Sequence, residues 1–248
     1  MCLKRLLIIA LFLPFFSTAA TLEQVEQYLS ISNAEEELLL LESQFSSMQN
    51  GFSQDNNASE NETYDMQMFS LRFKEYIQTH LSENEMAEVL QSYKNVIFLQ
   101  FISATSVNNT ENNETENYIK ILKEDPEASV RLGLVEKINS EVNNKESMVV
   151  MFDELMKPLM QSAKGGKNLD DETMKQRRES YMKTMIESSH NETLYATKDF
   201  SIEELEKLLE IAQTPAIGYE MKTIYGATAY ALKEFFLSMA SRYDISKH

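Results

Sequence analysis

The sequence predicts an all-α fold, a helical bundle built from two diverged but similar halves. Apolar residues recur at helical spacing along most of the 248-residue chain, and no segment shows period-two alternation bounded by turn residues. Serine, threonine, asparagine and aspartate stand before these apolar stretches, where they can cap helices. One capped pattern also occurs twice, at 81–99 and at 200–222.

The stretch 200–222 predicts two helices that meet at a corner. Ser201 is an N-cap residue, and Glu204 three positions later completes a capping box. Pro215 ends the first helix and fits the first position of the next one. Gly218 has no side chain, so we expect close backbone approach near the corner. The residues of this structural signature are Ser201, Glu204, Leu205, Thr214, Pro215, Gly218 and Lys222.

A tandem duplication would explain why the pattern repeats. Ser82 aligns with Ser201, and Asn95 falls where Thr214 does, although Val96 replaces the proline. Upstream of the two copies lies another matching pair, Val25-Glu26 before Asn33 and Val135-Glu136 before Asn144. The expected organisation is a signal peptide at 1–20, an N-terminal helical half at 21–105, a polar linker loop at 106–117 and a C-terminal helical half at 118–248.

The individual helices follow from caps, prolines and periodicity. In chain order we expect them to begin at Thr21, Asn33, Tyr64, Ser82, Tyr118, Asp125, Asn144, Asp170 or Asp171, Ser201 and Pro215. Stretches 50–63 and 106–117 are polar and rich in asparagine, which predicts loops. The helix that Asp170 begins is expected to end at Ile186. Pro158 lies inside an expected helix and should kink or break it.

The first twenty residues predict export. Lys4 and Arg5 precede an apolar run at 6–16, and small residues follow, which is typical of a signal peptide cleaved after Ala19 or Ala20. The run is short for a membrane span, and no later stretch is apolar enough, so we expect no integral membrane segment after cleavage. The one cysteine lies in this leader, so the mature chain has no disulfide or thiolate site. A periplasmic or secreted location follows.

The charge of the chain disfavours nucleic acid as a partner. The chain carries 39 acidic and 23 basic side chains, a formal net charge of −16. Such a surface repels phosphate backbones and anionic headgroups. The simplest interpretation of the acidity is solubility.

Methionines gather in one region and admit three interpretations. Unbranched thioether side chains can fill an ordinary core, line an adaptable apolar groove, or bind Cu(I). We favour the core, because stripes at helical spacing mark burial more often than binding. The possible groove residues are Met148, Met151, Met156, Met160, Met182 and Met185.

No pattern identifies a catalytic, cofactor or metal site. His80 and His190 precede the two capped copies, but no H-x-x-x-H spacing supports a metal centre, and exposed histidines at helix ends are the simpler interpretation. Adjacent acids such as Glu203-Glu204 and Asp170-Asp171 point apart on a helix and more simply face solvent or cap it. Nucleophile-elbow and phosphate-loop motifs are missing.

The corner resembles the C-terminal signature of a bacterial exported family, the domain of unknown function numbered twenty fifty-nine. The resemblance lies in Glu203-Glu204-Leu205, Thr214-Pro215, Gly218 and Lys222, and it extends from Met148 to Lys222. Members typically carry an aromatic pair where this chain has Ile211-Ala212, and their P-x-G spacing is one residue shorter. The resemblance implies an all-helical periplasmic protein that follows a signal peptide, and no particular activity.

These observations lead to three functional hypotheses. The first is a non-catalytic periplasmic protein that binds an envelope protein, a peptide or an apolar ligand. The second is a carboxylate-dependent hydrolase, which a closed pocket with two acids of raised pKa would favour. The third is a methionine-based Cu(I)-binding protein.

Overall fold

The computed structural model describes residues 18–54, 65, 67–106, 112–163, 166 and 169–240 and confirms the all-α prediction. The described residues form no strand, and their single isolated bridge joins Ala19 and Ser82. In chain order the helices are α1 (Leu22–Ile31), α2 (Ala34–Gln54), α3 (Gln67–His80), α4 (Glu83–Ser92), α5 (Val96–Ser106), α6 (Asn112–Glu124), a 3₁₀ turn (Pro126–Ala128), α7 (Ser129–Val142), α8 (Lys145–Met151), a π-helical turn (Phe152–Met156), α9 (Lys157–Ser162), α10 (Asp171–Ala196), α11 (Ile202–Ala212) and α12 (Pro215–Ala240).

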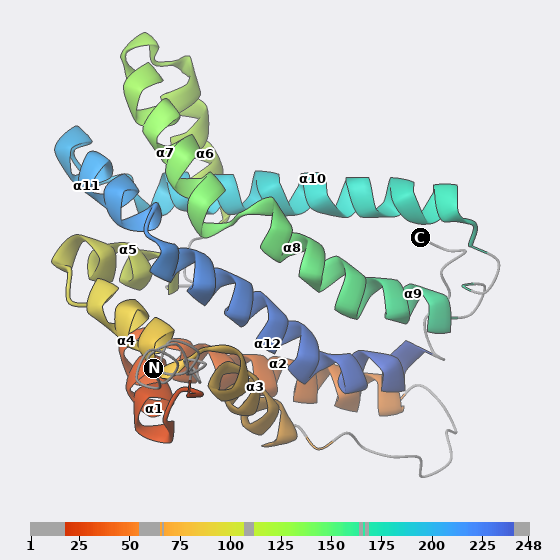
Figure 1. Ribbon diagram of the computed structural model, residues 1–248. Coiled ribbons are helices and arrows are strands. Elements are labelled where there is room, and N and C mark those ends of the chain that lie inside the picture. The colour runs from red at the N-terminus through yellow and green to blue at the C-terminus, as the bar shows by residue number, and fades with distance from the viewer. Residues whose placement is uncertain are drawn as a thin grey trace, which may run out of the picture.

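The last of the described helices, α12, crosses the centre of the molecule (Figure 1). It packs against α3 and α4 of the first half, and also against α7, α8 and α9. The last helix of the first half, α5, packs in turn against α10 and α11 of the second half. Each half therefore supplies one helix to the other. The duplication of the two halves stays a prediction.

The corner forms as expected. The backbone N–H of Glu204 donates to Ser201 Oγ at 3.2 Å, and Ser201 N–H donates to Glu204 Oε2 at 2.7 Å. The equivalent box forms at Ser82 and Glu85. Arg131 of α7 holds the segment before α11, since its guanidinium donates to the carbonyl oxygens of Thr197 and Phe200.

The interpretation of Gly218 is wrong. Gly218 is exposed, and a Cβ placed on it would have no neighbouring heavy atom within 4 Å. The close approach occurs two turns later, at Gly226, where a Cβ would lie 2.5 Å from the hydroxyl oxygen of Tyr76. The crossing of α12 over α3 thus depends on Gly226. Lys222 is exposed, whereas Leu205 is fully buried.

Helices differ from the expected bounds at three places. α2 continues to Gln54, inside the stretch 50–63 expected to be a loop. α10 continues ten residues past Ile186. Ser189 and Thr193 are buried there, and Thr193 Oγ1 donates to the carbonyl of Ser189 at 2.8 Å. α6 begins at Asn112, inside the stretch expected to be a loop. Near Pro158 the helix changes as expected, since a π-helical turn precedes α9 and accommodates the residue that has no N–H to donate.

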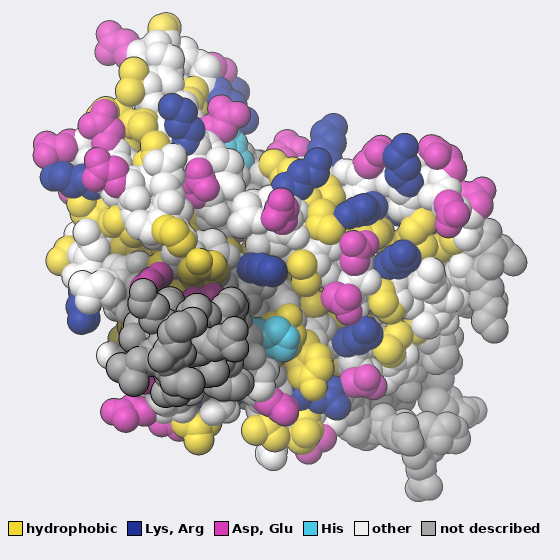
Figure 2. All heavy atoms as spheres, in the orientation of Figure 1, with side chains coloured by type: hydrophobic (Ala, Val, Ile, Leu, Met, Phe, Trp, Pro, Cys, Tyr) yellow, Lys and Arg dark blue, Asp and Glu magenta, His cyan; other side chains and the backbone are white. Residues whose placement is uncertain are grey.

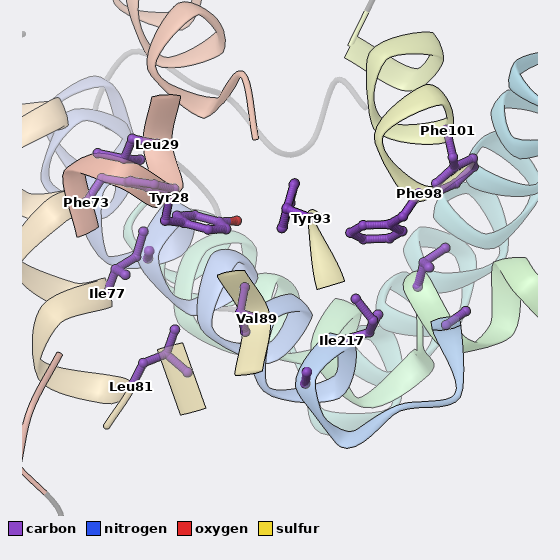
Figure 3. Packing of buried hydrophobic residues seen from close by; sticks show 14 of the residues in the cluster. Tyr28, Leu29, Phe73, Ile77, Leu81, Val89, Tyr93, Phe98, Phe101 and Ile217 are labelled. Atoms are coloured by element: carbon purple, nitrogen blue, oxygen red, sulfur yellow. The ribbon is translucent and has the colours of Figure 1, made fainter. Parts of the chain in front are cut away.

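One hydrophobic core runs through both halves. Its fully buried aromatic residues include Phe69, Phe98 and Phe235. Figure 3 shows part of this core, where Tyr28, Tyr93 and Phe98 lie in one row between helices. The rings of Tyr93 and Phe98 are 5.0 Å apart and nearly perpendicular.

The expected signal peptide falls almost wholly on residues 1–17, outside the described residues. The described part of it, Thr18 to Ala20, lies extended against the start of α4. Ala20 N–H donates to the carbonyl of Leu81 at 2.9 Å, and Glu83 N–H donates to the carbonyl of Thr18 at 2.8 Å. Among the helices of the described residues, none is long and apolar enough to cross a membrane.

Candidate functional site

A buried carboxyl group on α12 is the most unusual polar feature of the described core. Glu220 is 1% exposed, and its Oε1 accepts hydrogen bonds from the hydroxyls of Tyr28, at 2.8 Å, and Tyr93. Its other oxygen, Oε2, is buried and has no hydrogen-bond partner. A buried oxygen without a partner costs free energy, so a fold does not retain one by default.

Three distant segments bring this group together. Tyr28 comes from α1, Tyr93 follows the end of α4, and Glu220 lies in the second turn of α12. The two tyrosine rings meet edge to face, with centroids 5.8 Å apart. In Figure 3 the hydroxyl of Tyr28 points toward Tyr93. The capping box of α4 and the proline of α12 fix the directions of these helices, and so they position the trio.

Burial controls the protonation of the trio. Removal from water raises the pKa of Glu220 to about 7, while the hydroxyls of Tyr93 and Tyr28, as donors to the carboxylate, lower it again in part. Burial first, and then the neighbouring groups, raise the pKa of Tyr28 and Tyr93 well above the ordinary value. Near neutral pH Glu220 therefore exchanges between carboxyl and carboxylate, and both tyrosines stay protonated.

A small pocket of about 190 Å³ adjoins the trio. Helices α1, α2, α3, α5 and α12 all contribute to its lining, which is largely apolar. Phe73 adds a third aromatic ring, and the exposed Glu37 adds a second carboxylate. The described lining holds no lysine, arginine or histidine.

A larger open cleft of about 1070 Å³ lies between α7, α8 and α10. Its apolar lining is Val149, Met182 and Ile186, of which Ile186 is 40% exposed. Its charged lining consists of the cations Lys145, Lys175, Arg178 and Lys183 and the exposed acids Glu136, Glu179 and Glu187. Figure 2 shows such cations and acids around exposed apolar side chains on this face, over the helices that Figure 1 labels α8 and α10.

The inner end of the cleft is polar. Asn139 Oδ1 accepts from Asn143 Nδ2 at 3.0 Å and lies 3.0 Å from the hydroxyl oxygen of Thr193. His190 lies at the same end, and its Nε2 is buried without a hydrogen-bond partner. Burial, helped by the charge of Lys123, lowers the pKa of His190, so its ring is neutral at pH 7.

The methionines expected to form a groove take different places. Met182 lines the cleft, and Met148 is fully buried in the core beside α12. The other four are partly buried, and they are Met151, Met156, Met160 and Met185. The cleft thus contains one of the six, and most of its lining comes from other residue types.

His80 and His190 lie in different surroundings. The ring of His80 stacks on Tyr76, with centroids 3.6 Å apart, while His190 lies in the cleft on α10. Within the described part of the chain no group of three or more histidine, cysteine, aspartate or glutamate side chains could hold a metal ion.

Sequence reasoning missed Glu220, although one signal was available. On α12, Ala216, Ile217, Ala227 and Ala231 are buried at helical spacing, and Glu220 falls within their stripe. An acid in such a stripe predicts a buried carboxyl group. Comparison with known proteins adds no assignment: no family model, no curated protein and no solved structure matches this chain.

Proposed function

We propose that this protein acts by binding, and that the cleft between α7, α8 and α10 holds an amphipathic organic anion with an apolar body and one acidic group. The observation that carries the proposal is the cleft itself, an open space of about 1070 Å³ with apolar side chains surrounded by cations. Ligand sites of this kind combine apolar area with a few polar groups that orient the ligand.

Charge complementarity selects the ligand. On a chain of net charge −16, the cleft gathers four cations against three acids. Arg178 already forms an ion pair with Asp153 at 3.6 Å, but Lys145, Lys175 and Lys183 form none among the described residues. Their ammonium groups are available to an acidic ligand, and the buried Nε2 of His190 supplies a further polar atom at the inner end.

Binding is favoured over catalysis by the state of the cleft's own acids. Glu136, Glu179 and Glu187 are all exposed, so the cleft lacks a buried acid among its described lining residues. A carboxylate-dependent hydrolase needs acids whose surroundings shift their protonation. The hydrolase and the Cu(I) protein stay hypotheses, and a rise in melting temperature on addition of Cu(I) would support the latter.

We also propose that the protein acts outside the cytoplasm. The charged and apolar leader supports this location, and the resemblance of the corner to the exported family numbered twenty fifty-nine agrees with it. A ligand-binding protein of the bacterial envelope would meet amphipathic acids there.

The test measures dodecanoate binding by displacement of anilinonaphthalene sulfonate, a fluorescent apolar anion, from the purified protein. We expect dodecanoate to displace the dye and dodecanol, its neutral counterpart, to do so at least about ten-fold less well, a difference of roughly 1.4 kcal/mol. Equal displacement by the two would show that the cations do not select the ligand. An apolar peptide that outcompetes dodecanoate would instead identify a peptide-binding cleft.

A matched pair of variants locates the site. Ile186→Glu places a charge in the cleft and should weaken dodecanoate binding by about ten-fold or more. Ile202→Glu is the control, because Ile202 has almost the same exposure, 38% against 40%, but lies on α11 and does not line the cleft. If both variants bind dodecanoate as the wild type does, the cleft is not the site.

A further inference from the structure

We propose that the small pocket beside Glu220 is a second binding site, separate from the cleft, and that it takes a small organic ammonium ion. The ligand is a protonated alkylamine of a few carbon atoms, with the Glu220 carboxylate as its counter-ion. The cleft and this pocket share no lining residue, so the inference does not depend on the proposed function.

The first argument is the unpaired oxygen. Both tyrosine hydroxyls donate to Oε1 of Glu220, and Oε2 is left buried with no donor. An ammonium N–H would supply the missing hydrogen bond together with the opposite charge. The Glu220 side chain is 1% exposed, and it is the buried, incompletely bonded group of the pocket lining.

The second argument is the aromatic surroundings. Tyr28, Phe73 and Tyr93 all line the pocket, and their side chains are at most 4% exposed. Aromatic faces attract cations, and a cluster of them beside a carboxylate is the arrangement that recognises organic ammonium groups. The apolar residues Leu38, Ile102 and Ile224 would then contact the alkyl part.

Size and charge limit the ligand further. About 190 Å³ is several times the roughly 30 Å³ that one water molecule occupies in the liquid, which suits a molecule of a few heavy atoms. Every titratable group that faces the pocket from the described helices is an acid or a phenol, namely Glu37 on α2, Tyr28, Tyr93 and Glu220. With a chain of net charge −16 around it, the pocket favours cations over anions.

The predicted duplication supplies an internal comparison. Its alignment places Phe101 opposite Glu220, Ala212 opposite Tyr93 and Ile138 opposite Tyr28, and these three are buried apolar residues. Under this alignment, apolar side chains take the places that Glu220 and the two tyrosines have in the other half. Packing does not require an acid and two phenols, which argues that they serve a ligand.

The probe is n-butylammonium, measured by isothermal titration calorimetry, with 1-butanol as its neutral counterpart. We expect the wild type to bind butylammonium and to ignore butanol. As the pH is raised toward 7, the affinity should increase by up to about ten-fold per pH unit, and above pH 7 it should level off. The reason is that the cation binds the ionised carboxyl group, whose pKa is about 7. Titrations in buffers of different ionisation enthalpy should show that butylammonium binding releases protons at pH 6.

Variants separate the binding role from a structural one. Glu220→Gln should abolish butylammonium binding, and Glu206→Gln, which removes the same charge from an exposed position on α11, should leave it unchanged. Tyr93→Phe keeps the ring and removes a hydrogen bond that stabilises the Glu220 carboxylate. The loss of butylammonium affinity in this variant should therefore be larger at pH 6 than at pH 8.5. The proposal is overturned if folded wild type binds no butylammonium, if butanol binds equally well, or if folded Glu220→Gln binds as the wild type does.

Discussion

At the scale of single residues, Glu220 links stability to pH. Its carboxyl group titrates near pH 7 in the folded protein and near pH 4.5 when the chain is unfolded. Between these values the folded state holds the proton that the unfolded state has lost. The stabilisation is therefore complete below about pH 4.5 and is lost as the pH rises through 7.

Replacement of the acid isolates this effect. Relative to Glu220→Gln, we expect the unfolding free energy of the wild type to fall by about 3 kcal/mol between pH 4.5 and pH 7, since each unit of pKa difference corresponds to roughly 1.4 kcal/mol. Urea unfolding at a series of pH values measures the difference. If the unfolding free energies of the wild type and Glu220→Gln changed with pH in the same way, the pKa of Glu220 would be the same in the folded and unfolded states.

Two glycines of α12 offer a second residue-scale prediction. Gly218→Ala should raise stability by about 0.5–1 kcal/mol, because its new methyl group meets no atom and alanine favours the helix. Gly226→Ala should lower stability by about 1–3 kcal/mol, because the methyl group collides with the ring of Tyr76. Thermal melts measure whether the melting temperature rises in Gly218→Ala and falls in Gly226→Ala. Equal shifts in the two variants would contradict the close approach of α12 and α3 at Gly226.

At the scale of elements, local signals determined most of the helices. Thr21, Ser82 and Ser201 all form the capping boxes that the sequence predicts, because these bonds join residues three positions apart. The part of α10 after Ile186 was not predicted, because Ser189 and Thr193 are weak helix formers in isolation. They are helical here because they are buried against neighbouring helices.

The capping box of α11 leads to a prediction for that helix. Ser201→Ala removes the acceptor of the Glu204 N–H and should cost about 1 kcal/mol of stability. Ser188→Ala is the control, since Ser188 is an exposed residue in the middle of α10 and caps no helix. Chemical denaturation compares the two, and a loss at Ser188 as large as that at Ser201 would argue against a capping role.

The extended N-terminal segment bears on processing of the proposed signal peptide. The Ala20 side chain is 2% exposed and its N–H is bonded to Leu81, so the folded protein has a place for this residue. We expect cleavage after Ala19, which leaves the bonded Ala20 as the first residue. The intact mass of the exported protein distinguishes this from cleavage after Ala20.

At the scale of the whole molecule, the candidate site could not be read from sequence, because its parts are far apart along the chain. Tyr28 and Glu220 are 192 positions apart, and Tyr93 and Glu220 are 127 apart. Around Glu220 the sequence GYEMK resembles an ordinary exposed helix turn. The apolar stripe of α12 indicates only that Glu220 is buried. Its meeting with Tyr28 and Tyr93 follows from the path of α12 across α3 and α4, which is a tertiary property.

The exchange of helices between the halves predicts that neither half folds by itself. A fragment of residues 18–106 lacks the α12 cover of α3 and α4, and a fragment of residues 112–248 lacks the α5 cover of α10 and α11. Circular dichroism should show little cooperative melting for each fragment alone and a cooperative transition after mixing. A fragment that melts cooperatively without its partner would contradict the shared core.

Because α12 comes last among the described helices and lies across the centre of both halves, the order of synthesis matters. The ribosome must synthesise α12, which extends to Ala240, before the interior can close. Until then α3 and α4 lack the helix that packs against them in the folded protein. We propose that this chain is exported through a translocon. A delay in folding keeps the chain unfolded while it is translocated.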